Sequence, residues 1–289
     1  MGRASAARRL LASIRFGEVC VLQGTPIMGA LFALDRLSPA LLWPFGLLLA
    51  GNLCLIVHVF VLNDWAGIIG DARDPRRAGH TFLAHGTSPA AMGGMALACL
   101  GASLALFALL GLEPFVFGLL IALLSAVYSL RGKGVPVLSS LLHLVGGTLH
   151  FLLGAAAFAQ IDGPMMAIAA YFGVVFAAGH LTHEARDHDG DRDNAIRTNA
   201  VAFGRRRAFV ASLTLFALSY ALMAVLAGTG HVPLALGAVA VVSGMIHAAA
   251  ALRAHRAALT FEALRQLQSV YRLLHLGIGL TLLLTVPPW

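Results

Sequence analysis

The sequence predicts an all-α, polytopic membrane helical bundle of about nine transmembrane helices, in a single integral membrane domain over residues 1–289. Hydrophobic residues make up 59% of the chain and charged residues only 11%. The mean hydropathy is +0.83. A soluble domain needs more polar surface than this, so most of the outer face is expected to meet lipid. Long apolar runs recur along the chain, and the charges between them alternate from one connection to the next.

Nine apolar runs are long enough to cross a bilayer, which takes roughly 17–25 residues. The run 114–130 is short, so a re-entrant or surface helix is the alternative there. The boundaries of each run are placed where its apolar residues begin and end. In chain order the runs cover residues 16–34, 40–62, 89–111, 114–130, 137–159, 164–181, 208–228, 232–252 and 268–286.

The connections between these runs divide by charge. With Arg272 at the start of the last run counted among them, the connections on one side hold every Lys and Arg except Arg36. Cytoplasmic connections are rich in Lys and Arg, so we expect a bacterial inner (plasma) membrane protein with a cytoplasmic N-terminus and an outside C-terminus. The net charge of +7 could suggest nucleic-acid binding, but the basic residues are distributed as an orientation signal, so we expect no nucleic-acid partner. The basic side comprises the N-terminus and residues 63–88, 131–136, 182–207 and 253–267.

Eight of the thirteen acidic residues fall in two short windows. Both windows follow an even-numbered run, the second and the sixth, so both are expected at the cytoplasmic surface of the membrane. Carboxylates beside a medium of low dielectric constant are costly unless something compensates them. Shared cations would do so. The acidic residues are Asp64, Asp71 and Asp74 in the first window, and Glu184, Asp187, Asp189, Asp191 and Asp193 in the second.

The spacing within each window supports a shared cation site. In the first window, Asn63, Gly67 and Asp71 are four residues apart, and the second window holds a trio with spacings of three and four. If each apolar run continues as a helix past the interface, each trio lies on one helical face. Mg²⁺ prefers oxygen ligands, taking one or two carboxylates together with water and substrate phosphates. The second trio is Glu184, Asp187 and Asp191.

Basic residues and a tyrosine beside the acidic windows suit a phosphorylated substrate. Arginine can form paired hydrogen bonds to phosphate oxygens, and lysine supplies a compact charge. The alternative is an ordinary solvated loop in which Arg and Asp pair with each other. The basic run at 205–207 is explained by orientation and by contact with membrane lipid headgroups. The candidates for phosphate contact are Arg73, Arg76, Arg77, Tyr128, Arg131, Lys133, Arg186, Arg192 and Arg197.

At these residues the sequence resembles the UbiA superfamily of intramembrane prenyltransferases. That superfamily carries NDxxDxxxD after its second helix, and DxxD-xxx-D, often ending in GDR, after its sixth. Here residues 63–71 read NDWAGIIGD, and residues 184–192 read EARDHDGDR. Nine spans with long second and sixth cytoplasmic loops also match the superfamily's plan, so the resemblance covers essentially the whole chain.

The resemblance implies a UbiA-like bundle with a central cavity that opens toward lipid. Two Mg²⁺ ions would be held by both motifs and would bind an isoprenyl diphosphate, whose apolar tail would lie among the spans. Carried over by position, the catalytic, metal and diphosphate ligands would be Asn63, Asp64, Asp71, Asp187 and Asp191, with Glu184 where the family usually has Asp. The matching diphosphate contacts would be Arg77, Tyr128, Arg131, Lys133 and Arg192.

Gly67 is the clearest departure from the prenyltransferase pattern, because it replaces the middle Asp of the first motif. It matches the UbiA-type terpene cyclases, whose motifs read Nxxx(G/A)xxxD and DxxxD. We therefore favour a cyclase, with a prenyltransferase that uses a small aromatic or other lipid-soluble acceptor as the alternative. A transporter or lipid-binding scaffold is disfavoured, because few charges lie within the spans. Aromatic side chains that could stabilise a cation, or simply pack, are Phe60, Trp65, Phe151, Phe172 and Phe176.

Overall fold

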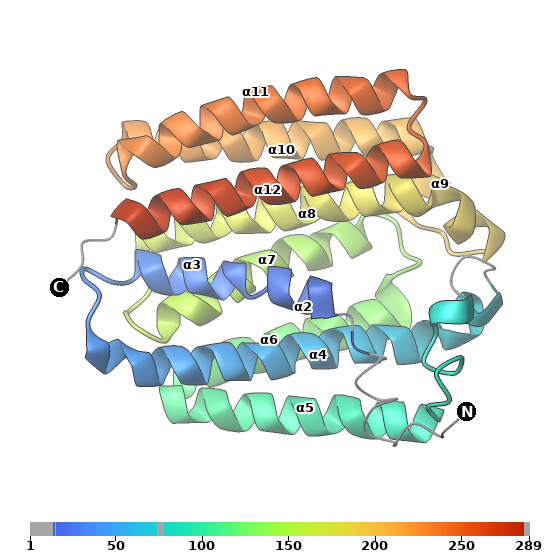
Figure 1. The fold of residues 1–289 in the computed structure, drawn as a ribbon, viewed down its shortest axis with the longest axis horizontal. Helices are drawn as coiled ribbons and strands as arrows, with labels where there is room; N and C mark the ends of the chain where they lie inside the picture. Colours follow the sequence, from blue (N-terminus) through green and yellow to red (C-terminus); the bar gives the residue numbers. More distant parts are fainter. Residues whose placement is uncertain (1–13, 15, 74–77, 286–289) are drawn as a thin grey trace, which may run out of the picture. The chain divides into compact units, whose positions relative to one another are not determined.

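The structure is a computed structural model that describes residues 14, 16–73 and 78–285. The helices form an all-α bundle, as predicted (Figure 1). Eight of the described helices are long and apolar enough to cross a membrane. The chain divides into two compact units, each built from segments that are distant in sequence. The single-domain organisation stays a prediction, and the two units are described separately below.

Unit 1 comprises residues up to Gln23 and the segment Leu42–Gly132. The two long helices α4 and α5 pack closely along each other. A five-residue π-helical segment, Tyr128–Gly132, continues from α6 and contacts both α6 and α4. The helices of this unit are α2 (Phe16–Val21), α4 (Leu42–Arg73), α5 (Pro89–Leu110) and α6 (Leu112–Val127).

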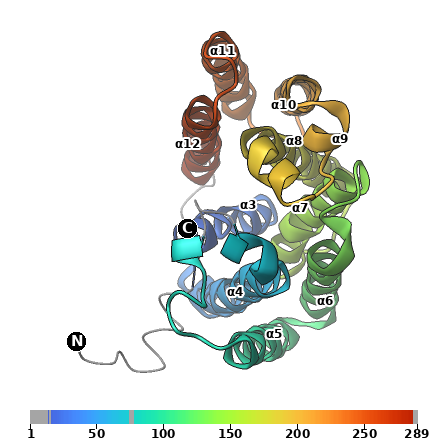
Figure 2. The ribbon, with the colours of Figure 1, turned by 90° about the vertical axis from the view of Figure 1, so that its right-hand side faces the viewer.

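Unit 2 comprises Gly24–Leu41 and the chain from Lys133 onward. Here α8 packs against α7 on one side and α10 on another, and α11 packs against both α10 and α12. The short α9 lies beside the ends of α8 and α10 (Figure 2). The helices are α3 (Gly24–Phe32), α7 (Leu138–Ala156), α8 (Gly163–Asp193), α9 (Asn199–Phe203), α10 (Arg205–Gly228), α11 (Leu234–Arg256) and α12 (Phe261–Thr285).

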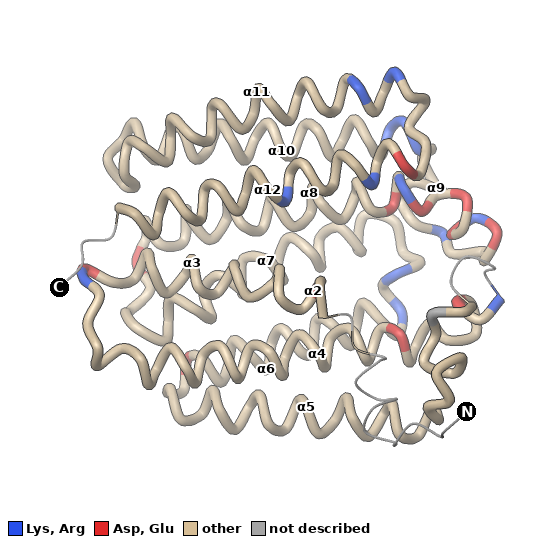
Figure 3. The backbone as a smooth tube through the Cα atoms, in the orientation of Figure 1, with Lys and Arg blue, Asp and Glu red and all other residues tan. Residues whose placement is uncertain are grey.

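The second and sixth apolar runs continue as helices well beyond their apolar residues. Helix α4 has 32 residues and ends at Arg73, and α8 has 31 residues and ends at Asp193. Each acidic motif therefore lies on a continuous helix, as the interpretation of its residue spacing required. In unit 2, the charged residues gather toward one end of α8, α10, α11 and α12 (Figure 3).

The first apolar run, 16–34, does not form one continuous spanning helix. It folds as α2 and α3, separated by two residues. Pro26 explains the break, because a proline inside a helix lacks the N–H that would bond to the carbonyl four residues earlier, that of Leu22. In unit 1, the buried Asn52 amide compensates, since its Nδ2 donates to Gln23 Oε1 at 3.0 Å and to Leu22 O at 3.5 Å. The first of the nine expected spans is thus two short apolar helices.

Glycines allow the closest helix contacts in unit 2. A Cβ atom added at Gly154 would lie 1.9 Å from the carbonyl oxygen of Pro26, and one at Gly29 would lie 2.1 Å from that of Phe151. Both distances are far below van der Waals contact, so α3 and α7 can touch only because these positions carry no side chain. Small residues at helix contacts are common in membrane bundles, where they let the backbones approach.

Candidate functional site

The first acidic motif occupies the last turns of α4 in unit 1. Asn63, Asp64 and Asp71 are all partly buried. A Cβ atom added at Gly67 would meet only Asp71 Oδ2, at 3.6 Å, among neighbours within 4 Å. Positions 67 and 71 therefore share a helical face, as their spacing predicted. The missing side chain leaves room beside the Asp71 carboxylate.

The π-helical segment brings two predicted diphosphate contacts to the helix that bears this motif. Tyr128 is partly buried and Arg131 is exposed, and their segment packs on α4 within unit 1. A π-turn inside a helical region is rare and often marks a functional site. Arg77, a third predicted contact, lies outside the described residues.

Trp65 packs α4 against α5. Its indole Nε1 donates a hydrogen bond to the carbonyl oxygen of Pro89 at 3.1 Å, and its ring lies next to Gly93. Helix packing, the alternative to cation stabilisation, accounts for this side chain.

Glu184 in the second motif is enclosed by protein groups of unit 2. Its side chain is 4% exposed. Ser139 on α7 donates to Oε1 at 3.1 Å, and His180 Nε2 lies 2.9 Å from the same oxygen. The backbone N–H of Asn199, at the start of α9, donates to Oε2 at 2.9 Å. The carboxylate of Glu184 on α8 is thus hydrogen-bonded to α7 and to α9.

Asn199 extends this network to the segment that begins at Lys133. Its Nδ2 donates to Ser139 Oγ at 3.1 Å, and its Oδ1 accepts from the Val137 N–H at 2.7 Å. Val137 has a φ of 66°, a rare conformation for a β-branched residue, and this hydrogen bond helps to hold it. The segment also approaches the chain after α8, since a Cβ atom on Gly134 would lie 3.9 Å from the backbone nitrogen of Arg197.

Asp187 is paired with its neighbour Arg186. The guanidinium donates to both carboxylate oxygens at 2.8 Å. Arg186 Nη1 also donates to Gln268 Oε1 on α12 at 2.6 Å, and the guanidinium carbon lies 5.4 Å from the centre of the Phe261 ring. Arg186, a predicted phosphate contact, here orients Asp187 and links α8 to α12.

The remaining residues of the second motif differ in exposure. Asp191 is 6% exposed, whereas the Arg192 side chain is 61% exposed. Arg192 lies 3.9 Å from Asp189 and 3.8 Å from Asp193, distances typical of weak surface pairs. Asp189 also pairs with Arg205 at the start of α10. Asp191 is therefore the buried carboxylate on the same helical face as Asp187.

Sequence reasoning missed three polar residues of this network: Ser139, Asn199 and Gln268. Only Asn199 had a local signal. It follows Thr198, whose hydroxyl caps α9 by accepting from the Val201 N–H, and Thr before an apolar run is a typical helix start. Ser139 and Gln268 contact the motif only through tertiary packing.

The donor atoms of both motifs are oxygens, which is the chemistry that Mg²⁺ requires. Within the described part of the chain, no three His, Cys, Asp or Glu side chains converge as ligands of one ion. Mg²⁺ is commonly bound through one or two carboxylates plus water and phosphates, so such convergence is unnecessary. Asp187 and Asp191, one helical turn apart, meet this requirement within unit 2.

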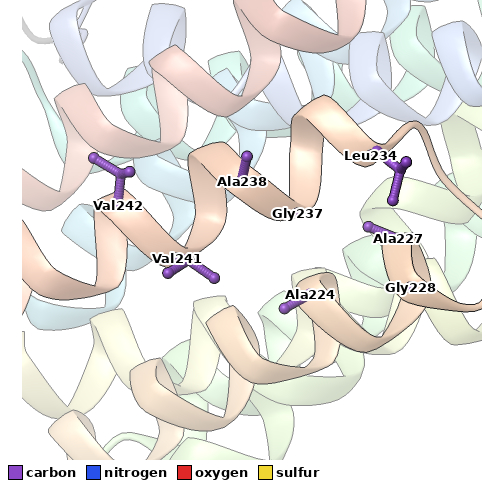
Figure 4. A pocket seen from close by; sticks show the side chains of 8 residues that line it. All are labelled: Ala224, Ala227, Gly228, Leu234, Gly237, Ala238, Val241 and Val242. Atoms are coloured by element: carbon purple, nitrogen blue, oxygen red, sulfur yellow. The ribbon is translucent and has the colours of Figure 1, made fainter.

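A separate groove lies between α10 and α11 and offers no chemistry of its own. Its volume is about 480 Å³ (Figure 4). Its surroundings suit a hydrocarbon chain rather than a charged group. It is lined by Ala224, Ala227, Gly228, Leu234, Gly237, Ala238, Val241 and Val242.

Comparison with solved structures identifies the fold. The apo structure of a UbiA homolog from Aeropyrum pernix K1 is 20% identical, with a TM-score of 0.76 over 95% of this chain and 100% of that one. A UbiA homolog from Archaeoglobus fulgidus bound to GPP and Mg²⁺ is 17% identical, with a TM-score of 0.70 over 96% and 100%. A digeranylgeranylglyceryl phosphate synthase structure is 13% identical, with a TM-score of 0.74 over 97% and 98%.

Sequence comparison supplies the family. No curated protein matches the chain. The model of the UbiA prenyltransferase family matches residues 24–270, which is most of the sequence. Taken with the eight apolar helices of spanning length, this match shows that the chain is an integral membrane enzyme belonging to the UbiA prenyltransferase family.

Proposed function

We propose that the chain binds an isoprenyl diphosphate together with Mg²⁺ and ionises it to an allylic carbocation. The observation that carries this proposal is the placing of both acidic motifs on the polar ends of long apolar helices. A charged head then meets oxygen ligands and cations while a hydrocarbon tail stays with apolar side chains. The Archaeoglobus fulgidus homologs bound to GPP or DMAPP with Mg²⁺ support this substrate class.

In this proposal the two motifs hold two Mg²⁺ ions. Their ligands are drawn from the first motif on α4 and from Asp187 and Asp191 on α8. A carboxylate oxygen has two lone pairs and can accept a hydrogen bond while it binds a cation, so the pairing of Asp187 with Arg186 is compatible with a role as a ligand. Bound Mg²⁺ would neutralise the charge that develops on the departing diphosphate. The ligands from α4 are Asn63, Asp64 and Asp71.

The proposed diphosphate contacts lie in or near the two motifs and in the connection after α6. Arginine, lysine and tyrosine side chains donate hydrogen bonds to the phosphate oxygens and hold the head in one orientation. The allylic C–O bond then breaks, and its electron pair leaves with the diphosphate. The contacts are Arg77, Tyr128, Arg131, Lys133 and Arg192.

We assign Glu184 a positioning role in place of its expected role as a metal ligand. Its Oε1 accepts from Ser139 and also lies 2.9 Å from His180 Nε2, and its Oε2 accepts from the Asn199 backbone, so both lone pairs of Oε1 face protein groups. A carboxylate engaged in this way fixes the end of α8 relative to α7 and α9. Asp187 and Asp191 are thereby held in place for the substrate.

For the fate of the cation, we propose cyclisation onto the double bonds of the same substrate, ended by loss of a proton or capture of water. Gly67 supports it, because the position beside Asp71 is open rather than acidic. Transfer of the prenyl group to a lipid-soluble acceptor is the second candidate, supported by the family to which the chain belongs.

Incubation of purified protein with farnesyl or geranylgeranyl diphosphate and Mg²⁺, without any acceptor, tests both candidates. A cyclase releases diphosphate and forms a cyclic hydrocarbon or alcohol, detected by gas chromatography and mass spectrometry. Prenylation of an added aromatic acceptor, with no product in its absence, would show the transferase instead. Failure of both reactions in the presence of Mg²⁺ would contradict the proposed substrate class.

We also propose that the motif side of the protein faces the cytoplasm of a bacterial inner membrane. The distribution of Lys and Arg supports this orientation. Reporter fusions test it: a fusion at the C-terminus is expected outside, and one in the connection between α8 and α10 inside.

A further inference from the structure

Four helices of unit 2 enclose a group of aromatic and histidine side chains that the proposed reaction does not use. Phe216 lies at its centre, with its ring centre 4.4 Å from that of His247, 4.9 Å from Tyr271 and 5.9 Å from His275. The group, called the interior cluster below, consists of Tyr171 on α8, Phe216 and Tyr220 on α10, His247 on α11, and Tyr271 and His275 on α12.

Three polar atoms of the interior cluster are buried without a hydrogen-bond partner in the structure: Tyr171 Oη, His247 Nε2 and His275 Nε2. Tyr171 is 0% exposed and His247 is 2% exposed. Buried polar groups in folded proteins are nearly always hydrogen-bonded, to protein or to ordered water. The Tyr171 and His275 ring centres lie 6.3 Å apart, and the His247 and His275 rings both lie beside Phe216, so three such atoms in one cluster point to a bound polar group.

The second nitrogen of each histidine indicates what this group must provide. His275 Nδ1 lies 2.8 Å from the carbonyl oxygen of Tyr271, so Nδ1 carries the proton and Nε2 is an acceptor. His247 Nδ1 lies 3.1 Å from Tyr220 Oη. We assign the phenol as the donor in this pair, which leaves the proton of His247 on Nε2. The cluster thus presents one acceptor, one donor and the Tyr171 hydroxyl, which can act as either.

We propose that the interior cluster is a binding site for one hydroxyl group, either that of water or that of a lipid-soluble alcohol. A hydroxyl both donates and accepts, as the His275 and His247 nitrogens together require. The aromatic rings around it suit an attached hydrocarbon. Tyr171 precedes Asp187 by sixteen residues on α8, about 24 Å along a helix, so Tyr171 is well separated from the second acidic motif, and the proposal does not depend on the proposed reaction.

The variant Tyr171→Phe tests the site through the sign of its effect on stability. If Tyr171 Oη were truly unpartnered in a dry interior, replacing it with hydrogen would leave the melting temperature of the detergent-solubilised protein unchanged or higher. If it binds a hydroxyl group, the melting temperature falls by about 2–4 °C. The comparison variant is Ser103→Ala on α5, which removes one fully buried hydroxyl outside the cluster that also has no partner in the structure. A fall in melting temperature that is larger for Tyr171→Phe than for Ser103→Ala is specific to the cluster.

Two further arms separate the sources of the hydroxyl. If Tyr171→Phe lowers the melting temperature of the protein without added ligand, the bound hydroxyl group is that of water. If instead farnesol raises the melting temperature of the parent more than farnesene, its hydrocarbon counterpart, and Tyr171→Phe abolishes that difference, the alcohol is the ligand. The double variant Tyr171→Phe with His275→Phe should lose less than the sum of the single losses, because both side chains contact one group. The proposal is overturned if Tyr171→Phe melts at or above the parent both without and with farnesol.

Discussion

The two acidic motifs occupy equivalent places, the last turns of a long helix, but their surroundings differ. On α4, the motif residues are partly exposed and Gly67 leaves open space beside Asp71. On α8, Glu184 and Asp191 are buried, and hydrogen bonds connect the motif to α7, α9 and α12. The first motif therefore offers ligands that can adapt to a substrate. The second is part of the fold, so substitutions there should affect stability as well as catalysis.

The largest expected effect comes from removing one carboxylate in each motif. Asp71→Ala and Asp191→Ala should each lower turnover by about 100-fold or more, because each removes charge stabilisation at the departing diphosphate. Only Asp191→Ala should also lower the melting temperature, since Asp191 is buried. Activity and thermal unfolding are measured on the same preparations.

The control for this pair is Asp193→Ala, whose side chain is 70% exposed and which should change neither quantity. Retained activity in both the Asp71 and Asp191 variants would contradict the proposed site. Equal loss of stability in the two would contradict the contrast between the motifs.

Glu184→Gln should destabilise the protein by about 2 kcal/mol, because one oxygen that accepts hydrogen bonds becomes an amide that cannot. The Mg²⁺ concentration that gives half-maximal activity should stay unchanged in the folded fraction, as expected for a positioning residue. Glu262→Gln, an exposed change on α12, is the control. A raised Mg²⁺ requirement without loss of stability would show that Glu184 is a metal ligand.

Gly67→Asp should lower the Mg²⁺ concentration that gives half-maximal activity several-fold, with little effect on the melting temperature. The open space admits a side chain beside Asp71, and a second carboxylate there would add an oxygen ligand. The control is Ala72→Asp, which adds the same charge at an exposed position about 140° around the helix from residue 67. If both variants have the same Mg²⁺ dependence as the parent, residue 67 does not face the ions.

The smallest effect is expected for Trp65→Phe. This change removes the hydrogen bond to Pro89 at an exposed site and should cost about 1 kcal/mol or less. The product profile should be unchanged, because Trp65 packs two helices together. A new product distribution in a stable variant would restore Trp65 as a residue that contacts the cation.

The sequence was a good guide to the helices and a poorer one to their ends. Apolar runs of spanning length predicted nine helices, and eight of these are long apolar helices in the described part of the chain, because hydropathy is a local property. The first run was harder to interpret, since its hydropathy does not reveal that Pro26 interrupts it. Its break depends on Asn52, 29 residues from Gln23, which provides the hydrogen bonds that the helix lacks.

By itself, the sequence determined the membrane class, the all-α fold and the positions of the two acidic motifs, because hydropathy and the helical repeat act over a few neighbouring residues. The tertiary structure decided which side chains are bound and which face open space. Glu184 meets Ser139 from 45 residues away, and Arg186 meets Gln268 from 82 residues away. The partners in these contacts are brought together only by helix packing, so no local pattern could have distinguished the buried Glu184 from the partly exposed Asp71 or revealed the interior cluster.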